Sequence, residues 1–225
     1  MSSPPQPPAT DEREGEGARE DPVEAAGRAP LGDAFGSALG GRLGVAESTL
    51  PPVTFVVVVT ATGQDTTAAA IVAVAIAAVL TLARMVRRQT PLYALTGVGG
   101  VAVAGYIASR TGRAEDFFLP GLLANVAYAS VFIISIAVRW PLLGVIVAGA
   151  AGGDMAWRED PVRRRAYTRA SGIWVVLFLS RIAVQLPLYL AGALVALGTA
   201  RVAMGIPLFA LGAWLSWLLL RRTES

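Results

Sequence analysis

The stretch Ala170–Leu197 decides the fold, and it reads ASGIWVVLFLSRIAVQLPLYLAGALVAL. A membrane-spanning helix needs about 20 consecutive apolar residues, and here Arg181 is the only charge in a longer run. An ionisable group at such depth costs roughly 2.5–3.5 kcal/mol on insertion scales, so it requires a partner and often marks function. The sequence therefore predicts a membrane protein with a candidate functional residue inside one span.

Further apolar segments predict an all-α membrane protein with about six transmembrane helices. Hydrophobic residues make up 54% of the 225 positions, and the mean hydropathy is +0.57. A soluble protein is not expected, because its uncharged apolar runs rarely reach spanning length. The predicted spans are Leu50–Gly63, Ala68–Ala83, Pro91–Ser109, Phe117–Val138, Ala170–Leu190 and Gly205–Leu220.

Two apolar segments are too short for an ordinary crossing. Leu50–Gly63 reaches about two thirds of a ~30 Å hydrocarbon core at ~1.5 Å per residue, so we expect a hairpin with Ala68–Ala83. A short, Pro-interrupted segment of this kind indicates a transporter binding site, or else a tilted hairpin in a thinned bilayer. Pro141–Gly153 predicts an interfacial or re-entrant helix.

Residues 1–47 predict a disordered, acidic, Pro-rich cytoplasmic tail, and residues 48–222 the multi-pass transmembrane domain. The tail carries nine acids and four Arg with almost no large apolar residues, a composition that cannot form a core. It lacks the basic start and apolar centre of a signal peptide.

Arginines cluster on one predicted side of the membrane, which indicates a plasma-membrane protein with both termini in the cytoplasm. Eleven lie on the side of the termini, outside the tail, and three on the other. The eleven are Arg84, Arg87, Arg88, Arg139, Arg158, Arg163, Arg164, Arg165, Arg169, Arg221 and Arg222; the three are Arg110, Arg113 and Arg201. Because these residues sit at span ends, the pI near 9.8 indicates topology and not nucleic-acid binding.

The residue types present argue against an enzyme. The chain has no Cys and no His, and all 19 basic residues are Arg, so the common general bases, metal ligands and Schiff-base lysines are missing. No carboxylate pair has metal-site spacing, and no Gly-rich loop joins a strand to a helix. We expect no catalytic residue, no metal and no cofactor.

Polar residues inside the spans predict one intramembrane site. Arg181 and Gln185 share a helix face, as do Asn125 and Tyr128. Asn125 and Gln185 are expected at similar depth, with Arg181 one turn deeper. If these faces meet, they form a polar pocket with Gln64 and Asp65 as its outer lid. Guanidinium groups bind carboxylates and phosphates bidentately, so an anion or polar-headgroup site is one reading. The other is a structural Arg181 satisfied by Asn, Gln and backbone carbonyls.

Charged residues outside the spans suggest two further contacts. Arg110, Arg113, Glu115 and Asp116 precede Phe117, and they indicate either an extracytoplasmic contact site or a solvated helix end. Arg163, Arg164 and Arg165 are expected to attract anionic lipid headgroups, as well as to determine topology. A protein partner in the envelope or a homodimer is the remaining expectation, and nucleic acid is not.

Several of these stretches resemble an uncharacterised actinobacterial family of integral membrane proteins, a domain of unknown function. The resemblance runs from about Gly40 to Arg222, and Arg110–Pro120 (RTGRAEDFFLP) is its most specific part. The layout is more remotely similar to the intracellular septation protein A family, whose members maintain the cell envelope. Further matches are Gly40–Gly44, Leu50-Pro51 with Phe55, Arg139–Gly144, Trp157-Arg158, and Arg181 through Pro187–Tyr189.

The leading expectation is a non-enzymatic membrane component in cell-envelope homeostasis or scaffolding. The alternative is a small transporter or carrier with its site around Arg181, and a membrane enzyme acting on a lipid-linked substrate comes third. A scaffold should tolerate loss of the intramembrane polar residues, whereas a carrier should not.

Overall fold

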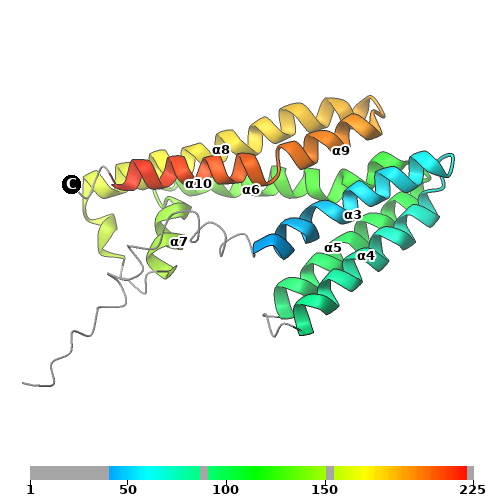
Figure 1. Ribbon diagram of the computed structural model, residues 1–225. Helices are drawn as coiled ribbons and strands as arrows, with labels where there is room; N and C mark the ends of the chain where they lie inside the picture. Colours follow the sequence, from blue (N-terminus) through cyan, green and yellow to red (C-terminus); the bar gives the residue numbers. More distant parts are fainter. Residues whose placement is uncertain (1–40, 87–90, 151–154, 222–225) are drawn as a thin grey trace, which may run out of the picture. The chain divides into compact units, whose positions relative to one another are not determined.

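The computed structural model describes residues 41–86, 91–150 and 155–221, and within those ranges the protein is entirely helical (Figure 1). Nearly all of the predicted disordered tail lies outside the described residues. The helices are α3 Gly41–Ala61, α4 Thr66–Val86, α5 Pro91–Thr111, α6 Leu119–Ala137, α7 Leu142–Ala150, α8 Pro161–Leu190, α9 Leu194–Ala203 and α10 Ile206–Arg221, with 3-10 turns η1 Ala114–Phe118 and η2 Ala156–Arg158.

Four helical stretches in the described part of the chain are long and apolar enough to cross a membrane: Thr66–Ala83, Ala114–Ala137, Pro161–Leu190 and Leu194–Arg221. Helices suit such segments because every backbone polar group can be satisfied within the segment in lipid. Large apolar side chains on these helices face outwards, for example Val176 at 68% exposure and Leu190 at 71%. An outward apolar surface of this kind suits a lipid environment.

The predicted hairpin is present as α3 and α4, which pack against each other. Its first helix is longer than expected, because α3 begins at Gly41 and contains Pro51 and Pro52. The apolar part of α3, Ser48–Ala61, is still shorter than an ordinary span. At the turn, the Asp65 carboxylate accepts hydrogen bonds from the backbone N–H groups of Thr67 (3.0 Å) and Ala68 (2.9 Å), so it caps the start of α4.

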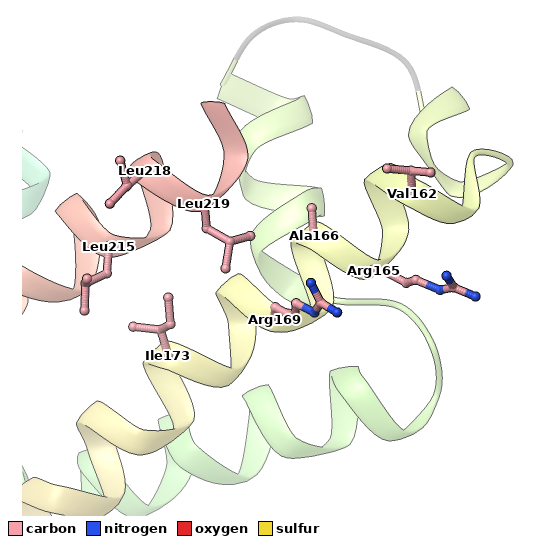
Figure 2. A pocket seen from close by; sticks show the side chains of 8 residues that line it. All are labelled: Val162, Arg165, Ala166, Arg169, Ile173, Leu215, Leu218 and Leu219. Carbon is pink, nitrogen blue, oxygen red and sulfur yellow. The ribbon is translucent and has the colours of Figure 1, made fainter. Parts of the chain in front are cut away.

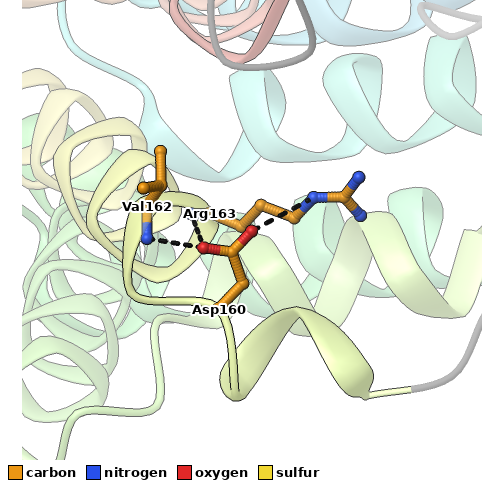
Figure 3. A network of polar contacts seen from close by, with 3 residues as sticks. All are labelled: Asp160, Val162 and Arg163. Atoms are coloured by element: carbon orange, nitrogen blue, oxygen red, sulfur yellow. Dashed lines mark hydrogen bonds and ion pairs between the residues drawn. The ribbon is translucent and has the colours of Figure 1, made fainter.

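Helix α8 is one continuous helix of 30 residues, so most of the basic stretch Trp157–Arg169 is helical. Its start is capped by Asp160, whose carboxylate accepts hydrogen bonds from the backbone N–H groups of Val162 (2.8 Å) and Arg163 (3.4 Å) (Figure 3). The other Asp160 oxygen lies 3.7 Å from Nε of Arg163. The predicted span from Ala170 to Leu190 is the second part of this helix.

The last predicted span, Gly205–Leu220, corresponds to α10, but the apolar stretch that contains it begins earlier in the chain. The apolar stretch runs from Leu194 to Arg221 and forms two helices, α9 and α10, with a break at Met204–Gly205. The chain reverses after α8 at Gly192, whose φ is +66°, so α9 packs back along α8 (Figure 1). The consequence is that Arg201 lies inside a candidate span and not in an outer loop.

The short segment after Arg139 forms α7, nine residues long, which packs on α8. Two serines supply acceptors for the first N–H groups of α7. The Ser135 hydroxyl accepts from Leu142 N (3.2 Å), and the Ser171 hydroxyl accepts from Leu143 N (3.3 Å). A short helix is thus present where an interfacial or re-entrant one was predicted, and its membrane depth stays a prediction.

Candidate functional site

Arg181 lies against the break between α9 and α10. One of its terminal nitrogens donates to the backbone carbonyl of Met204 and, at 2.8 Å, to that of Gly205. Carbonyls at a helix end lack intrahelical donors, and leaving them unpaired is costly in an apolar medium. This geometry favours the structural interpretation of Arg181, in which its acceptors are backbone carbonyls; neither Asn125 nor Gln185 accepts from it among the described contacts.

A second arginine, Arg201 on α9, lies close to Arg181. Its guanidinium rests against the backbone of Gly121 on α6, where an added Cβ would overlap it, and 5.6 Å from the centre of the Phe118 ring. Arg201 forms no hydrogen bond or ion pair with any residue that the structure describes. The arginine pair, Arg181 and Arg201, is therefore a site of uncompensated positive charge.

Gln185 and Asn125 flank the arginine pair. Gln185 is 3% exposed, so its amide is buried. Helices α8 and α9 run in opposite directions, and Arg181 is level with Met204 and Gly205, just after α9 ends. Gln185 is one turn further along α8, so it is level with Arg201. Asn125 is also buried, and its amide nitrogen donates to the Gly121 carbonyl at 3.0 Å. Arg201 of α9 and the buried Gln185 amide of α8 thus lie at one depth.

The other predicted members of the intramembrane site lie elsewhere. Tyr128 is 55% exposed, and its ring packs 5.3 Å from the ring of Phe178. Asp65 caps α4, and Gln64 occupies the α3–α4 turn with φ +78°. Arg181 and Gln185 therefore lie on α8 and Asn125 on the adjoining α6, whereas Gln64 and Asp65 lie at the α3–α4 turn and Tyr128 is exposed.

Gln64 belongs instead to a pocket that we call the three-turn pocket. It lies where the α3–α4, α5–η1 and α8–α9 turns meet, and its volume is about 680 Å³. Gln64, Arg113 and Glu115 supply its polar groups, and Gly63, Gly112 and Gly192 lie in its three turns. Each of these glycines has a positive φ, between +66° and +70°, which a residue with a side chain rarely adopts. Tight turns from three distant parts of the chain thus close one site.

The predicted loop site contributes to this pocket through two of its four residues. Arg113 and Glu115 line it, and Arg113 also lies over the Tyr189 ring at 5.5 Å. Asp116 is buried and accepts a hydrogen bond of 2.6 Å from the Tyr189 hydroxyl. Arg110 points to its own helix, with its guanidinium 5.3 Å from the centre of the Tyr106 ring.

Aromatic packing holds the wall of the pocket in place. Phe117 stacks on Phe55 of α3 with ring centres 3.9 Å apart, and Phe118 meets Phe117 edge to face at 5.5 Å. Both belong to η1, the turn that carries Glu115 and Asp116. The stacking ties η1 to α3, while the Asp116–Tyr189 bond ties it to α8.

The three arginines predicted to meet lipid headgroups have different surroundings. Arg163 pairs with Asp160, and all three side chains are exposed on α8. Only Arg165 lines a groove between α8 and α10, together with Arg169. No group of three or more Asp, Glu, His or Cys side chains that could hold a metal occurs in the described part of the chain.

Sequence reasoning missed Arg201, Gly121 and Tyr189 as site residues. Arg201 was counted as an outer-side arginine because α9 was not recognised as part of a span. The signal for it was present, since Leu194–Met204 contains no charge other than Arg201. Gly121 and Tyr189 carried no sequence signal, because their roles depend on residues about 70 or more positions away in the chain.

Comparison with known proteins places the chain in a family of unknown function. The family described as "Protein of unknown function (DUF3159)" matches residues 39–225. No curated protein and no solved structure matches the chain. The expectation of a domain of unknown function is confirmed, and the remoter similarity to the septation family stays a prediction.

Proposed function

Because the chain belongs to the DUF3159 family, which is defined without a function, we propose its role from the geometry: a non-enzymatic, six-span plasma-membrane protein of the cell envelope. Its proposed work is homeostasis or scaffolding through contacts at the three-turn pocket. The observation that carries this proposal is the convergence of three polar turns on one pocket, at the end of the bundle predicted to face outwards.

The pocket suits a contact site because it is both preformed and charged. Its turns are held by the Phe55–Phe117 stack and the Tyr189–Asp116 bond, so little ordering is needed when a partner binds. Arg113 and Glu115 present opposite charges, which favour a polar partner that carries both signs. An envelope protein is the partner that we propose.

A pair of matched variants tests the contact role. Arg113→Gln removes a charge that lines the pocket, whereas Arg110→Gln removes the same charge one turn earlier, outside it. We expect the first variant to lose complementation of a deletion strain at normal membrane levels, and the second to keep it. Full complementation by Arg113→Gln and Glu115→Gln would contradict the pocket as the working surface.

The six-span topology with cytoplasmic termini rests on the distribution of arginines. The structure moves Arg201 from the outer loops into a span, so only Arg110 and Arg113 remain on the proposed outer side, which strengthens the bias. The chain has no native cysteine. We expect Thr67→Cys to react with an impermeant thiol reagent in intact cells, and Glu159→Cys to react only after lysis; the reverse pattern would invert the topology.

A small carrier for an anion is the second candidate, favoured by the arginine pair. The Arg201 guanidinium, level with the buried Gln185 amide and next to a broken span, has the chemistry of a carboxylate or phosphate site. In this case Arg201→Gln should abolish complementation while Arg113→Gln does not, the opposite of the contact role. A membrane enzyme acting on a lipid-linked substrate is the third candidate and gains no support from these residues.

A further inference from the structure

The groove between the first half of α8 and the last turns of α10 combines apolar and cationic side chains. Its volume is about 630 Å³, within the range of ~300–1,000 Å³ typical of small-molecule sites. Ile173 of α8 and Leu215, Leu218 and Leu219 of α10 form apolar walls (Figure 2). Arg165 and Arg169, four residues apart and hence on one face of α8, lie toward its first turns. The α8–α10 groove is therefore apolar along its length and cationic at one end.

The length of α8 places these two parts at different membrane depths. Thirty residues at ~1.5 Å each span about 45 Å, some 15 Å more than a ~30 Å hydrocarbon core. With Leu190 near one boundary of the core, the other boundary falls near Ala170. Arg165 and Arg169 then lie at headgroup level, and Ile173 lies within the acyl region.

We propose that the α8–α10 groove binds an anionic phospholipid, with its phosphate at Arg165 and Arg169 and an acyl chain along Ile173 and the α10 leucines. Guanidinium groups bind phosphate bidentately, and the apolar walls match a hydrocarbon chain. The charge and the apolar surface follow one another in the order in which headgroup and chain occur in a lipid. This site rests on membrane insertion alone and is independent of the three-turn pocket.

Arg165 differs from its neighbours Arg163 and Arg164 in lining the groove, although all three carry the same charge on the same turn of α8. Neither neighbour lines the groove, and Arg163 already pairs with Asp160 at 3.7 Å. A diffuse attraction between basic residues and an anionic surface would use all of these arginines equally. A built site would depend on Arg165 and Arg169 only, so the neighbours provide a control of matched charge.

The test is lipid binding to the full-length protein in neutral detergent, measured by native mass spectrometry with phosphatidylglycerol or phosphatidylcholine. Each Arg near an anionic surface contributes a factor of about five, so two contribute about 30-fold. We expect the wild type to prefer phosphatidylglycerol by about this factor, R165Q/R169Q to lose the preference, and R163Q/R164Q to keep most of it. Equal losses in the two double variants would overturn the proposal.

A second variant tests the apolar part of the groove with both arginines retained. Ile173→Trp fills the space beside the α10 leucines, so we expect loss of both lipids with an unchanged melting temperature. If that variant does not fold, Leu218→Trp fills the same groove from the facing helix. Undiminished phosphatidylglycerol binding by a folded groove-filling variant, or no binding by the wild type, would show that the groove holds no lipid.

Discussion

Two helix seams of this protein are built from opposite kinds of residue. Where α4 meets α5, the seam consists of small residues, including Ala70, Ala104 and Ala108, and a Cβ added at Gly105 would lie 2.9 Å from the Cβ of Ala70. Where α8 meets α6 and α10, the seam consists of aromatic rings. Phe132 of α6 lies 6.2 Å from Trp174 and 5.9 Å from Phe178, and Phe209 of α10 meets Trp174 edge to face at 4.8 Å.

The difference shows two ways to hold helices together when lipid removes the hydrophobic driving force. Small residues let two backbones approach closely. Because these residues have no side-chain torsions that can rotate, an added atom between them must push the backbones apart. Aromatic rings fill a wider space between two backbones. The Trp174 indole N–H also donates a hydrogen bond to the Ser216 hydroxyl of α10 at 3.1 Å. We therefore expect the small-residue seam to be brittle and the aromatic seam to be tolerant.

The largest expected difference comes from adding one methyl group to each seam. At Gly105 the new Cβ meets the Cβ and Cα of Ala70, so the backbones must separate; at Gly212 it meets only the end of the Leu177 side chain, 2.8 Å away, which can rotate. We expect Gly105→Ala to cost about 2–3 kcal/mol in free energy of unfolding, the upper part of the range for overpacking. Gly212→Ala should be neutral or stabilising, because Ala is the better helix former by about 1 kcal/mol.

Thermal unfolding in neutral detergent, followed by circular dichroism, gives both values. Gly99→Ala is the control on α5, since nothing lies within 4 Å of a Cβ at that position. Equal destabilisation at positions 105 and 212 would remove the proposed distinction between the seams.

An intermediate effect is expected at the arginine pair. Arg181→Met leaves the Met204 and Gly205 carbonyls without their donor, at a cost of about 1–2 kcal/mol. Arg201→Met removes a charge that has no acceptor among the described residues, together with its contact to the Phe118 ring 5.6 Å away, so we expect a smaller loss of stability than for Arg181→Met.

The same unfolding measurement, performed on both variants and on the double variant, checks this prediction. Greater destabilisation by Arg201→Met than by Arg181→Met would show that Arg201 has a strongly stabilising partner. That result would argue against Arg201 as the anion-binding group of a small carrier.

The smallest effect is expected from the polar contact within the aromatic seam. A double-mutant cycle with Trp174→Phe and Ser216→Ala isolates the hydrogen bond between α8 and α10. Interhelical hydrogen bonds in membranes average about 0.6 kcal/mol, and we expect a coupling of that size. A coupling well above this value would mean that the aromatic seam depends on its polar contact as strongly as the other seam depends on Gly105.

Much of the helical layout could be predicted because each span is specified by its own residues. The α3–α4 hairpin, the end of α8 at Leu190 and a short helix at α7 all follow from local apolar length and turn residues. The start of α9 at Leu194 could not be predicted, because Gly192 reverses the chain within one continuous apolar stretch. That single turn moved Arg201 from an assumed loop into a span.

The sequence by itself determined that the chain is helical and apolar enough to cross a membrane several times, because a segment in lipid must satisfy its backbone groups internally. It also identified Arg181 and Gln185 as buried polar groups to be explained. Only the tertiary structure decided that Arg181 caps the α9–α10 break, that Arg201 rests on Gly121, and that Gln64 and Glu115 line one pocket. These contacts join residues far apart in the chain, so they depend on which helix faces meet and not on any local pattern.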